Sequence, residues 1–436
     1  MINAPRFLLK SAAFCALLLP WVIYAQPLPP SGFAELTKER TANSPLFNKI
    51  LRGETPFDAK NEEHNKAVDS FARFFAYRVT QEEIQKEPGK MDAAFKEVES
   101  LLRQLRSMPV VPAPTVAGMP TSIPNPVATN FISRLHIRCR EVYPNLKTIA
   151  RVNAVRMQSL LPTELATCDQ MGKKTLPGQF MDSFLTVFEK APDEGMKLYA
   201  LKGMAATYQA LRPLAVEKKA ANRVFLDPAL EAKIQETLCQ FVESKPQYAE
   251  NAPEEEKEGF RILRREAIRA LAQTRLPMTG AKAKTAFVLA RFANGKDIAP
   301  EQRFDEKVEA AIGLLNMRPV ENDPNDFNLD CAIQHFGHFL VDYFQRYNSR
   351  NDQEADKIFP WRYQAARIND ALNSLRAEVK SDYLNGMYPL IVVGLNSLET
   401  GKEGKVENLG GYLREKPLAS QLLFKKIPGT EVKLDN

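Results

Sequence analysis

Apolar residues recur every three or four positions along most of this chain, and this spacing constrains the fold more than any other feature. A helix turns by about 100° per residue, so residues at these intervals share one face and can be buried together. Only the run 389–394 is strand-like, and the buried end of a helix would explain it as well. The sequence therefore predicts an all-α protein.

Two apolar stripes predict helices near 62–87 and 91–107. After them, residues 109–126 contain six prolines, which lack an amide donor and do not fit inside a helix. We therefore expect an extended linker at 109–126, between an N-terminal helical segment at 26–108 and a larger helical domain at 127–399. The stripe residues are Val68, Phe71, Phe75 and Val79 in the first helix and Phe95, Val98, Leu102 and Leu105 in the second.

The larger region continues as helices separated by proline or glycine. The clearest helix covers 253–275, because proline lies in its first turn, three glutamates follow at the positive end of the helix dipole, and arginine ends it. Further helices are predicted near 327–346 and 360–380. The glycine-rich, charged segment 400–436 is expected to be an irregular tail, with an apolar patch at 422–424 that is suited to packing on the domain.

Two of the predicted helices share a pattern in which an apolar and a basic residue are followed, three residues later, by alanine and then by small or apolar residues. The matching residues are Met196, Lys197, Ala200, Gly203 and Met204 in one helix and Leu263, Arg264, Ala267, Ala270 and Leu271 in the other. This pattern resembles the second helix of HEAT repeats. In such repeats small residues let paired helices approach closely, and apolar residues fill the seam between successive hairpins.

The repeat is uneven along the chain. Fragments of the pattern occur at 150–154 and 361–365, and the prolines that close successive helices lie 51, 64 and 42 residues apart. Regular arrays of this kind hold a period of about 40–47 residues. We therefore predict an irregular HEAT-like array of helical hairpins, an α-α superhelix, with an irregular α-helical bundle as the alternative. The closing prolines are Pro162, Pro213, Pro277 and Pro319.

The first 25 residues have the pattern of an export signal. Arg6 and Lys10 give a positive start, residues 11–24 form an apolar run, and Ala25 offers a small residue at the expected cleavage point. An uncleaved anchor is the alternative, but the run is shorter than the roughly 20 apolar residues that span a bilayer. We expect an exported protein, periplasmic or secreted, with no stable membrane insertion after signal cleavage.

The expected mature chain is nearly balanced in charge. Removal of Arg6 and Lys10 lowers the formal net charge from +6 to +4, which is too small and too evenly spread to indicate nucleic-acid binding. Four cysteines would remain, and an oxidising compartment would allow one or two disulfides, with the pairing open. These cysteines are Cys139, Cys168, Cys239 and Cys331.

Four potential metal ligands, Cys331, His335, His338 and Asp342, fall within one stripe of the predicted helix at 327–346, opposite its apolar side. Their thiol, imidazole and carboxylate groups suit a zinc-like divalent metal. Because this stripe is about 16 Å long, one ion would reach only an adjacent pair and would need ligands from elsewhere. The alternative is a solvated helix face, or histidines bonded to a neighbouring helix. No other cofactor is indicated.

Arg261, Arg265 and Arg269 form a basic stripe on the outward face of the predicted helix at 253–275. Such a row is a candidate binding surface for an acidic partner or a polysaccharide. The alternative is a solvated face whose arginines pair internally with Glu258 or Glu266.

No catalytic motif stands out. Residues 394–402 only superficially resemble a phosphate-binding loop, because the gap after the first glycine is too long and Glu403 replaces the expected serine or threonine. We therefore expect a non-catalytic binding or scaffold protein whose helical-repeat surface binds a protein or peptide partner in the cell envelope. The alternative is an α-helical metal- or carboxylate-dependent hydrolase with an extracytoplasmic substrate. The sequence leaves the oligomeric state open.

Overall fold

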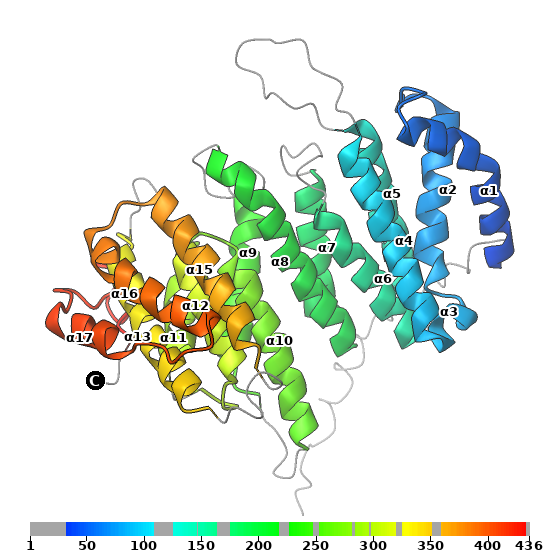
Figure 1. The fold of residues 1–436 in the computed structure, drawn as a ribbon. Coiled ribbons are helices and arrows are strands. Elements are labelled where there is room, and N and C mark those ends of the chain that lie inside the picture. The colour runs from blue at the N-terminus through cyan, green and yellow to red at the C-terminus, as the bar shows by residue number, and fades with distance from the viewer. Residues whose placement is uncertain are drawn as a thin grey trace, which may run out of the picture.

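The computed structural model is all-α, as predicted. Within the described residues the chain forms sixteen helices and no strand (Figure 1). None of these helices is both long and apolar enough to cross a membrane. The predicted export signal, the part of the predicted linker at 109–124, and Cys168 lie outside the described residues. The structure describes residues 32–108, 125–145, 147–163, 175–217 (213–217 as backbone only), 226–246, 253–280, 284–295, 298–319, 325–350 and 359–432.

Five helices form the N-terminal end of the array. They are α1 (Gly32–Leu51), α2 (Glu62–Arg78), α3 (Glu82–Lys86), α4 (Pro88–Ser107) and α5 (Pro126–Val142). Helix α2 begins at Asn61, whose side chain accepts hydrogen bonds from two amides of the first turn. Asn125 caps α5 in the same way and also donates to the carbonyl of Leu105 in α4. The predicted helix at 62–87 is thus divided into α2 and α3.

The remaining eleven helices continue the array. Helix α5 packs on α6, α7 on α8, α9 on α10, and α11 on α12, as expected for stacked hairpins. They are α6 (Thr148–Leu160), α7 (Leu176–Lys190), α8 (Glu194–Glu217), α9 (Pro228–Glu243), α10 (Glu254–Ala272), α11 (Thr285–Asn294), α12 (Phe304–Asn316), α13 (Leu329–Asn348), α15 (Trp361–Glu378), α16 (Asp382–Glu399) and α17 (Glu407–Glu415).

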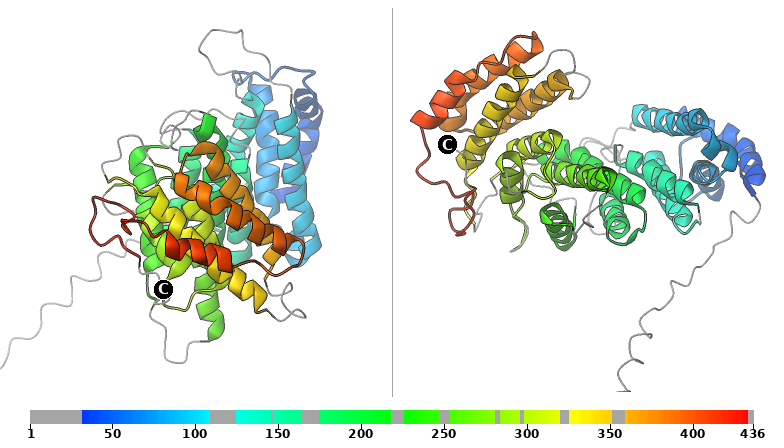
Figure 2. Two further views of the ribbon diagram at one scale, coloured as in Figure 1. Left: turned by 60° about the vertical axis from the view of Figure 1, so that its left-hand side comes forward. Right: turned by 90° about the horizontal axis from the view of Figure 1, so that it is seen from below.

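The second helices of these pairs form a continuous row. Helix α6 contacts α8, α8 contacts α10, α10 contacts α12, and α12 contacts α15. The first helices, α5, α7, α9, α11 and α13, form a second row in the same order. The two rows bend into an open arc, with α8 and α10 on its inner side (Figure 2). We call α6, α8, α10, α12 and α15 the inner row. This arrangement confirms the predicted helical-repeat-like array.

The small residues of the repeat pattern lie where helices approach closely. A Cβ atom built on Gly203 of α8 would lie 2.3 Å from Cζ of Phe184 in α7, so the ring occupies the space that a side chain would need. Ala200 and Ala267, which occupy matching positions of α8 and α10, are both completely buried. The pattern therefore marks the seams between helices, as the resemblance to HEAT repeats implies.

The C-terminal segment differs in part from its prediction. The strand-like run 389–394 lies inside α16, which continues through Pro389. The tail expected to be irregular contains α17, which packs on α13 and α16. Its apolar patch does pack on the array: Leu423 and Phe424 are fully buried, and the amide of Asn328 donates to the carbonyl of Leu423 at 2.9 Å.

Candidate functional site

The predicted basic stripe of α10 lies on the inner row, but none of its three arginines is free. Arg261 pairs with Glu254 at 2.5 Å, within its own helix. Arg265 and Arg269 both contact Glu266, also in α10. Internal pairing, the alternative weighed for this stripe, is therefore what the structure shows.

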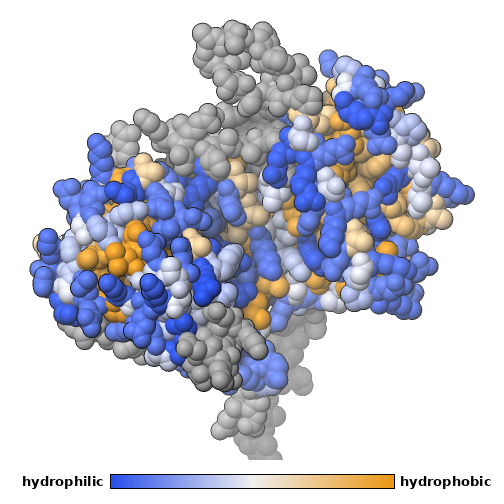
Figure 3. All heavy atoms as spheres, in the orientation of Figure 1, coloured by the Kyte–Doolittle hydropathy of each residue, from blue (hydrophilic) through white to orange (hydrophobic). Residues whose placement is uncertain are grey.

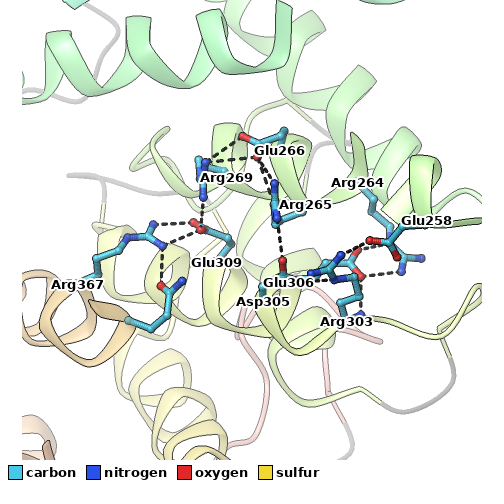
Figure 4. Close-up of polar contacts among 11 residues, drawn as sticks. Glu258, Arg264, Arg265, Glu266, Arg269, Arg303, Asp305, Glu306, Glu309 and Arg367 are labelled. Carbon is cyan, nitrogen blue, oxygen red and sulfur yellow. Dashed lines mark hydrogen bonds and ion pairs between the residues drawn. The ribbon is translucent and has the colours of Figure 1, made fainter. Parts of the chain in front are cut away.

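Two of these arginines also reach the next helix of the inner row. Arg265 pairs with Asp305 at 2.8 Å, and Arg269 pairs with Glu309 at 2.7 Å. From the other side, Arg367 of α15 holds both carboxylate oxygens of Glu309, at 2.7 and 2.8 Å. Figure 4 shows the resulting row of contacts across α10, α12 and α15. We call it the inner ladder: Arg265, Glu266, Arg269, Asp305, Glu309 and Arg367.

Charge in the inner ladder is balanced, with three arginines facing three carboxylates. Burial alone would raise the pKa of Glu309, but hydrogen bonds from Arg367 and Arg269 outweigh it and lower this pKa to about 2. The carboxylate therefore stays ionised across the physiological pH range. The surface predicted to be basic is locally neutral, and its side chains are held by several charge-assisted hydrogen bonds, of which the Arg367–Glu309 pair is bidentate.

A separate, fully buried ion pair also joins α10 to α12. The side chains of Arg264 and Glu306 are both 0% exposed, and Arg264 Nε donates to Glu306 Oε1 at 2.5 Å. Arg264 also donates to the carbonyl of Pro300 at 3.0 Å. This arginine is the basic residue of the HEAT-like pattern, so the pattern marks a buried link between α10 and α12.

One large aromatic side chain stands exposed beside the inner ladder. Tyr363, in the first turn of α15, is 63% exposed, more than any other large hydrophobic residue described as exposed. Its ring centroid lies 5.9 Å from the guanidinium carbon of Arg367. Hydrophilic side chains predominate on the face drawn in Figure 3, with apolar patches between them. An exposed tyrosine beside ordered arginines combines the residue types that dominate protein-binding surfaces.

The candidate metal stripe of α13 is buried at Cys331 and His335 and partly exposed at His338 and Asp342. Helix α13 is covered by α11, α12, α16 and α17, so Cys331 and His335 are fully buried together with the apolar side of the helix. Asp342 is engaged by Arg346 at 2.9 Å and by Lys307 at 3.6 Å. Among the described residues, no group of three or more potential ligands is placed to hold a metal ion.

His335 is the most unusual member of this stripe. Neither ring nitrogen has a hydrogen-bond partner, and burial, together with the nearby His338, lowers the pKa of His335 to about 4. The imidazole is therefore neutral at physiological pH. Because it is completely buried, a substrate could not meet it in this arrangement.

The three described cysteines are free thiols. Cys139, Cys239 and Cys331 are all buried and none forms a disulfide. The disulfides allowed by the sequence are therefore absent from the described part of the chain. The fourth cysteine of the predicted mature chain, Cys168, lies outside the described residues.

The sequence indicated the arginines that α10 contributes to the inner ladder, but not the partners that α12 and α15 supply. Asp305, Glu309 and Arg367 have no local signature, because they come near Arg265 and Arg269 only when the hairpins stack. The chain matches no protein-family model, no curated protein and no solved structure. Its site therefore has to be interpreted from its own geometry.

Proposed function

We propose that this chain is an exported, non-catalytic binding or scaffold protein that holds a protein or peptide partner on the inner row of its helical array. The observation that carries this proposal is Tyr363, exposed beside the inner ladder. Stacked helical pairs offer a long surface on which a partner makes many modest contacts. The pattern of the first 25 residues supports an envelope or extracellular location.

The ion pairs of the inner ladder fix the positions of its side chains and leave the ladder with no net charge. Each arginine that could contact a partner is already aligned by a carboxylate, so less side-chain freedom is lost when a partner binds. Because the ladder is neutral, we infer a partner that presents mixed polar groups and an apolar anchor, rather than a strongly acidic one. Tyr363 is the side chain that would pack against such an anchor.

The test compares two exposed apolar side chains on neighbouring helices. Tyr363→Ala removes the aromatic ring beside the inner ladder, whereas Val393→Ala shortens a 46% exposed side chain of α16. Each tagged variant and the unmodified full chain is crosslinked in the native envelope fraction, and captured proteins are quantified by mass spectrometry.

We expect one partner in near-stoichiometric amount with the unmodified chain and with Val393→Ala. Loss of an aromatic hot spot costs about 2 kcal/mol, so Tyr363→Ala should weaken binding of the purified partner by about thirtyfold. No stoichiometric partner, or equal capture by both variants, would contradict the proposal.

A further inference from the structure

Three arginines from different parts of the inner row lie around one carboxylate, and two of them bind it. Arg212 belongs to α8, Arg275 follows the end of α10, and Arg318 follows the end of α12. The carboxylate is that of Glu378, the last residue of α15. Ser374 lies one turn earlier in α15 and completes the group. We call these five residues the arginine cluster.

Glu378 is fully occupied by two of the three guanidinium groups. Arg318 holds both carboxylate oxygens at 3.0 Å, and Arg275 also contacts both oxygens. Ser374 Oγ donates to Glu378 Oε1 at 3.1 Å. Burial alone would raise the pKa of Glu378, but the hydrogen bonds from Arg275 and Arg318 lower it to about 2. The carboxylate is therefore charged and has no capacity left for a third arginine.

Of the three arginines in the cluster, Arg212 is the one that has no carboxylate partner among the described residues. Its Nη2 donates to Ser374 Oγ at 2.9 Å, and it forms no described ion pair. Burial and the charges of Arg275 and Arg318 lower the pKa of Arg212 to about 10. Among the described residues, three guanidinium groups beside one carboxylate leave two positive charges without a carboxylate partner, at a site that remains partly open to solvent.

Arg275 and Arg318 lie at the C-terminal ends of helices, where a positive charge is stabilising, but Arg212 does not. Arg318 Nη1 donates to the carbonyls of Leu315 and Met317, so it also caps the negative end of α12. Arg275 adopts φ 64°, a left-handed conformation that favours glycine or asparagine, and so directs the chain away from the end of α10. Arg212 lies inside α8, before its last turn, and compensates no helix end.

We propose that the arginine cluster binds a doubly charged tetrahedral oxyanion, of the kind carried by a phosphate monoester. Arg212 would be the direct ligand, held in place by the Ser374 hydroxyl, while Arg275 and Arg318 supply the surrounding positive charge. A phosphate monoester carries a charge of about −1.5 to −2 at pH 7, which matches the positive excess of the five described residues of the cluster. The site goes beyond the proposed protein binding, because it would take a free anion whether or not a partner is present.

The test measures binding of inorganic phosphate and of acetate to the purified full chain by isothermal titration calorimetry. Ionic strength is held constant with sodium chloride, and the variants are Arg212→Gln, Arg212→Lys and Arg376→Gln. Arg376 is a matched control because it lies on α15 near Glu378 but stacks on Tyr388, outside the cluster. Circular dichroism and thermal unfolding establish that each variant is folded.

We expect phosphate to bind more tightly than acetate, and Arg376→Gln to bind phosphate as the unmodified chain does. A hydrogen bond to a charged group is worth about 1.5–3 kcal/mol, so Arg212→Gln should weaken phosphate binding by about tenfold or more. Arg212→Lys keeps the positive charge, so its affinity for phosphate should lie between those of the unmodified chain and Arg212→Gln. Absence of phosphate binding by the unmodified chain, equal affinity for acetate, or undiminished binding by folded Arg212→Gln would each overturn the proposal.

Discussion

The side chains of Arg264 and Glu306 form an ion pair that solvent does not reach, with Nε and Oε1 2.5 Å apart and both side chains 0% exposed. The pair joins two consecutive helices of the inner row, α10 and α12. A buried charge is tolerated only while its partner and hydrogen bonds are in place, because desolvation of an unpaired ion costs several kcal/mol.

Removal of one member of this pair should therefore destabilise the protein far more than removal of an exposed pair. We expect Arg264→Met to lower the free energy of unfolding by about 3–5 kcal/mol, because Glu306 is left buried and unpaired. The double variant Arg264→Met, Glu306→Leu should recover much of this loss, since no unpaired charge remains. The free energies of unfolding of the unmodified chain, the single variant and the double variant are measured by urea unfolding followed by circular dichroism.

Arg261→Ala on the same helix is the control for this comparison. Its partner Glu254 is 64% exposed, so we expect a loss of about 1 kcal/mol or less. If Arg264→Met were as stable as Arg261→Ala, the buried pair would not hold α10 and α12 together as described.

The contact between Gly203 and Phe184 predicts that added volume is not tolerated where α7 meets α8. Gly203→Ala places a methyl group where the Phe184 ring lies, and overpacking of this kind costs about 1–3 kcal/mol. Gly411 in α17 has nothing within 4 Å of the position of an added Cβ. Gly411→Ala should therefore stabilise the protein by about 0.5–1 kcal/mol through its higher helix propensity. Thermal unfolding of both variants should show opposite shifts, and a stabilised Gly203→Ala chain would contradict the packing.

The buried histidines make stability depend on pH below neutrality. Burial lowers the pKa of His335 to about 4 and that of His136 to about 3. Both values lie below that of an unfolded histidine, near 6.5, so the stability contributed by each neutral ring is complete above pH 6.5 and is lost as the pH falls towards these values. Each ring should lower the free energy of unfolding by about 2 kcal/mol between pH 7 and pH 5.

His335→Asn tests this dependence. The variant removes one titrating ring, so its free energy of unfolding should fall less steeply between pH 7 and pH 5 than that of the unmodified chain. Urea unfolding at several pH values provides the comparison. Identical slopes for the two chains would show that His335 is protonated as readily in the folded protein as in the unfolded one.

The buried thiols should be unreactive until the array opens. Burial raises the pKa of Cys239 and Cys331 to about 12, and that of Cys139 above its usual range, so few thiolates form at pH 8. In a Cys168→Ser variant of the predicted mature chain, which begins after Cys15, we expect no rapid reaction with Ellman's reagent under native conditions, and three reactive thiols in denaturant. A thiol that reacts within seconds in the folded variant would contradict the described burial.

The helices could be predicted because their signals are local. Apolar spacing and an acidic first turn placed the helix at 253–275 within a few residues of α10, and the small residues around Gly203 marked a seam between helices. The partners of Arg265 and Arg269 could not be predicted, because Asp305 and Glu309 reach them only after the hairpins have stacked.

The burial of Cys331 and His335 in α13 could not be predicted for the same reason. The sequence showed polar residues opposite an apolar face, which is typical of a solvated stripe. Helices α16 and α17 cover α13 from a later part of the chain, and α17 lies in a segment that was expected to be irregular. A solvated face was therefore one of the alternatives for this stripe, although the completed array buries Cys331 and His335.

The hydrogen bond from Arg212 to Ser374 joins residues 162 positions apart in the chain, and it links α8 directly to α15, past α10 and α12. Elsewhere in the inner row each helix contacts its immediate neighbours, so bending at one hairpin is transmitted to the hairpins next to it. The arginine cluster joins one edge of four successive helices of the inner row, α8, α10, α12 and α15. Bending of the arc should therefore open the opposite edge, with the joined edge acting as its hinge line.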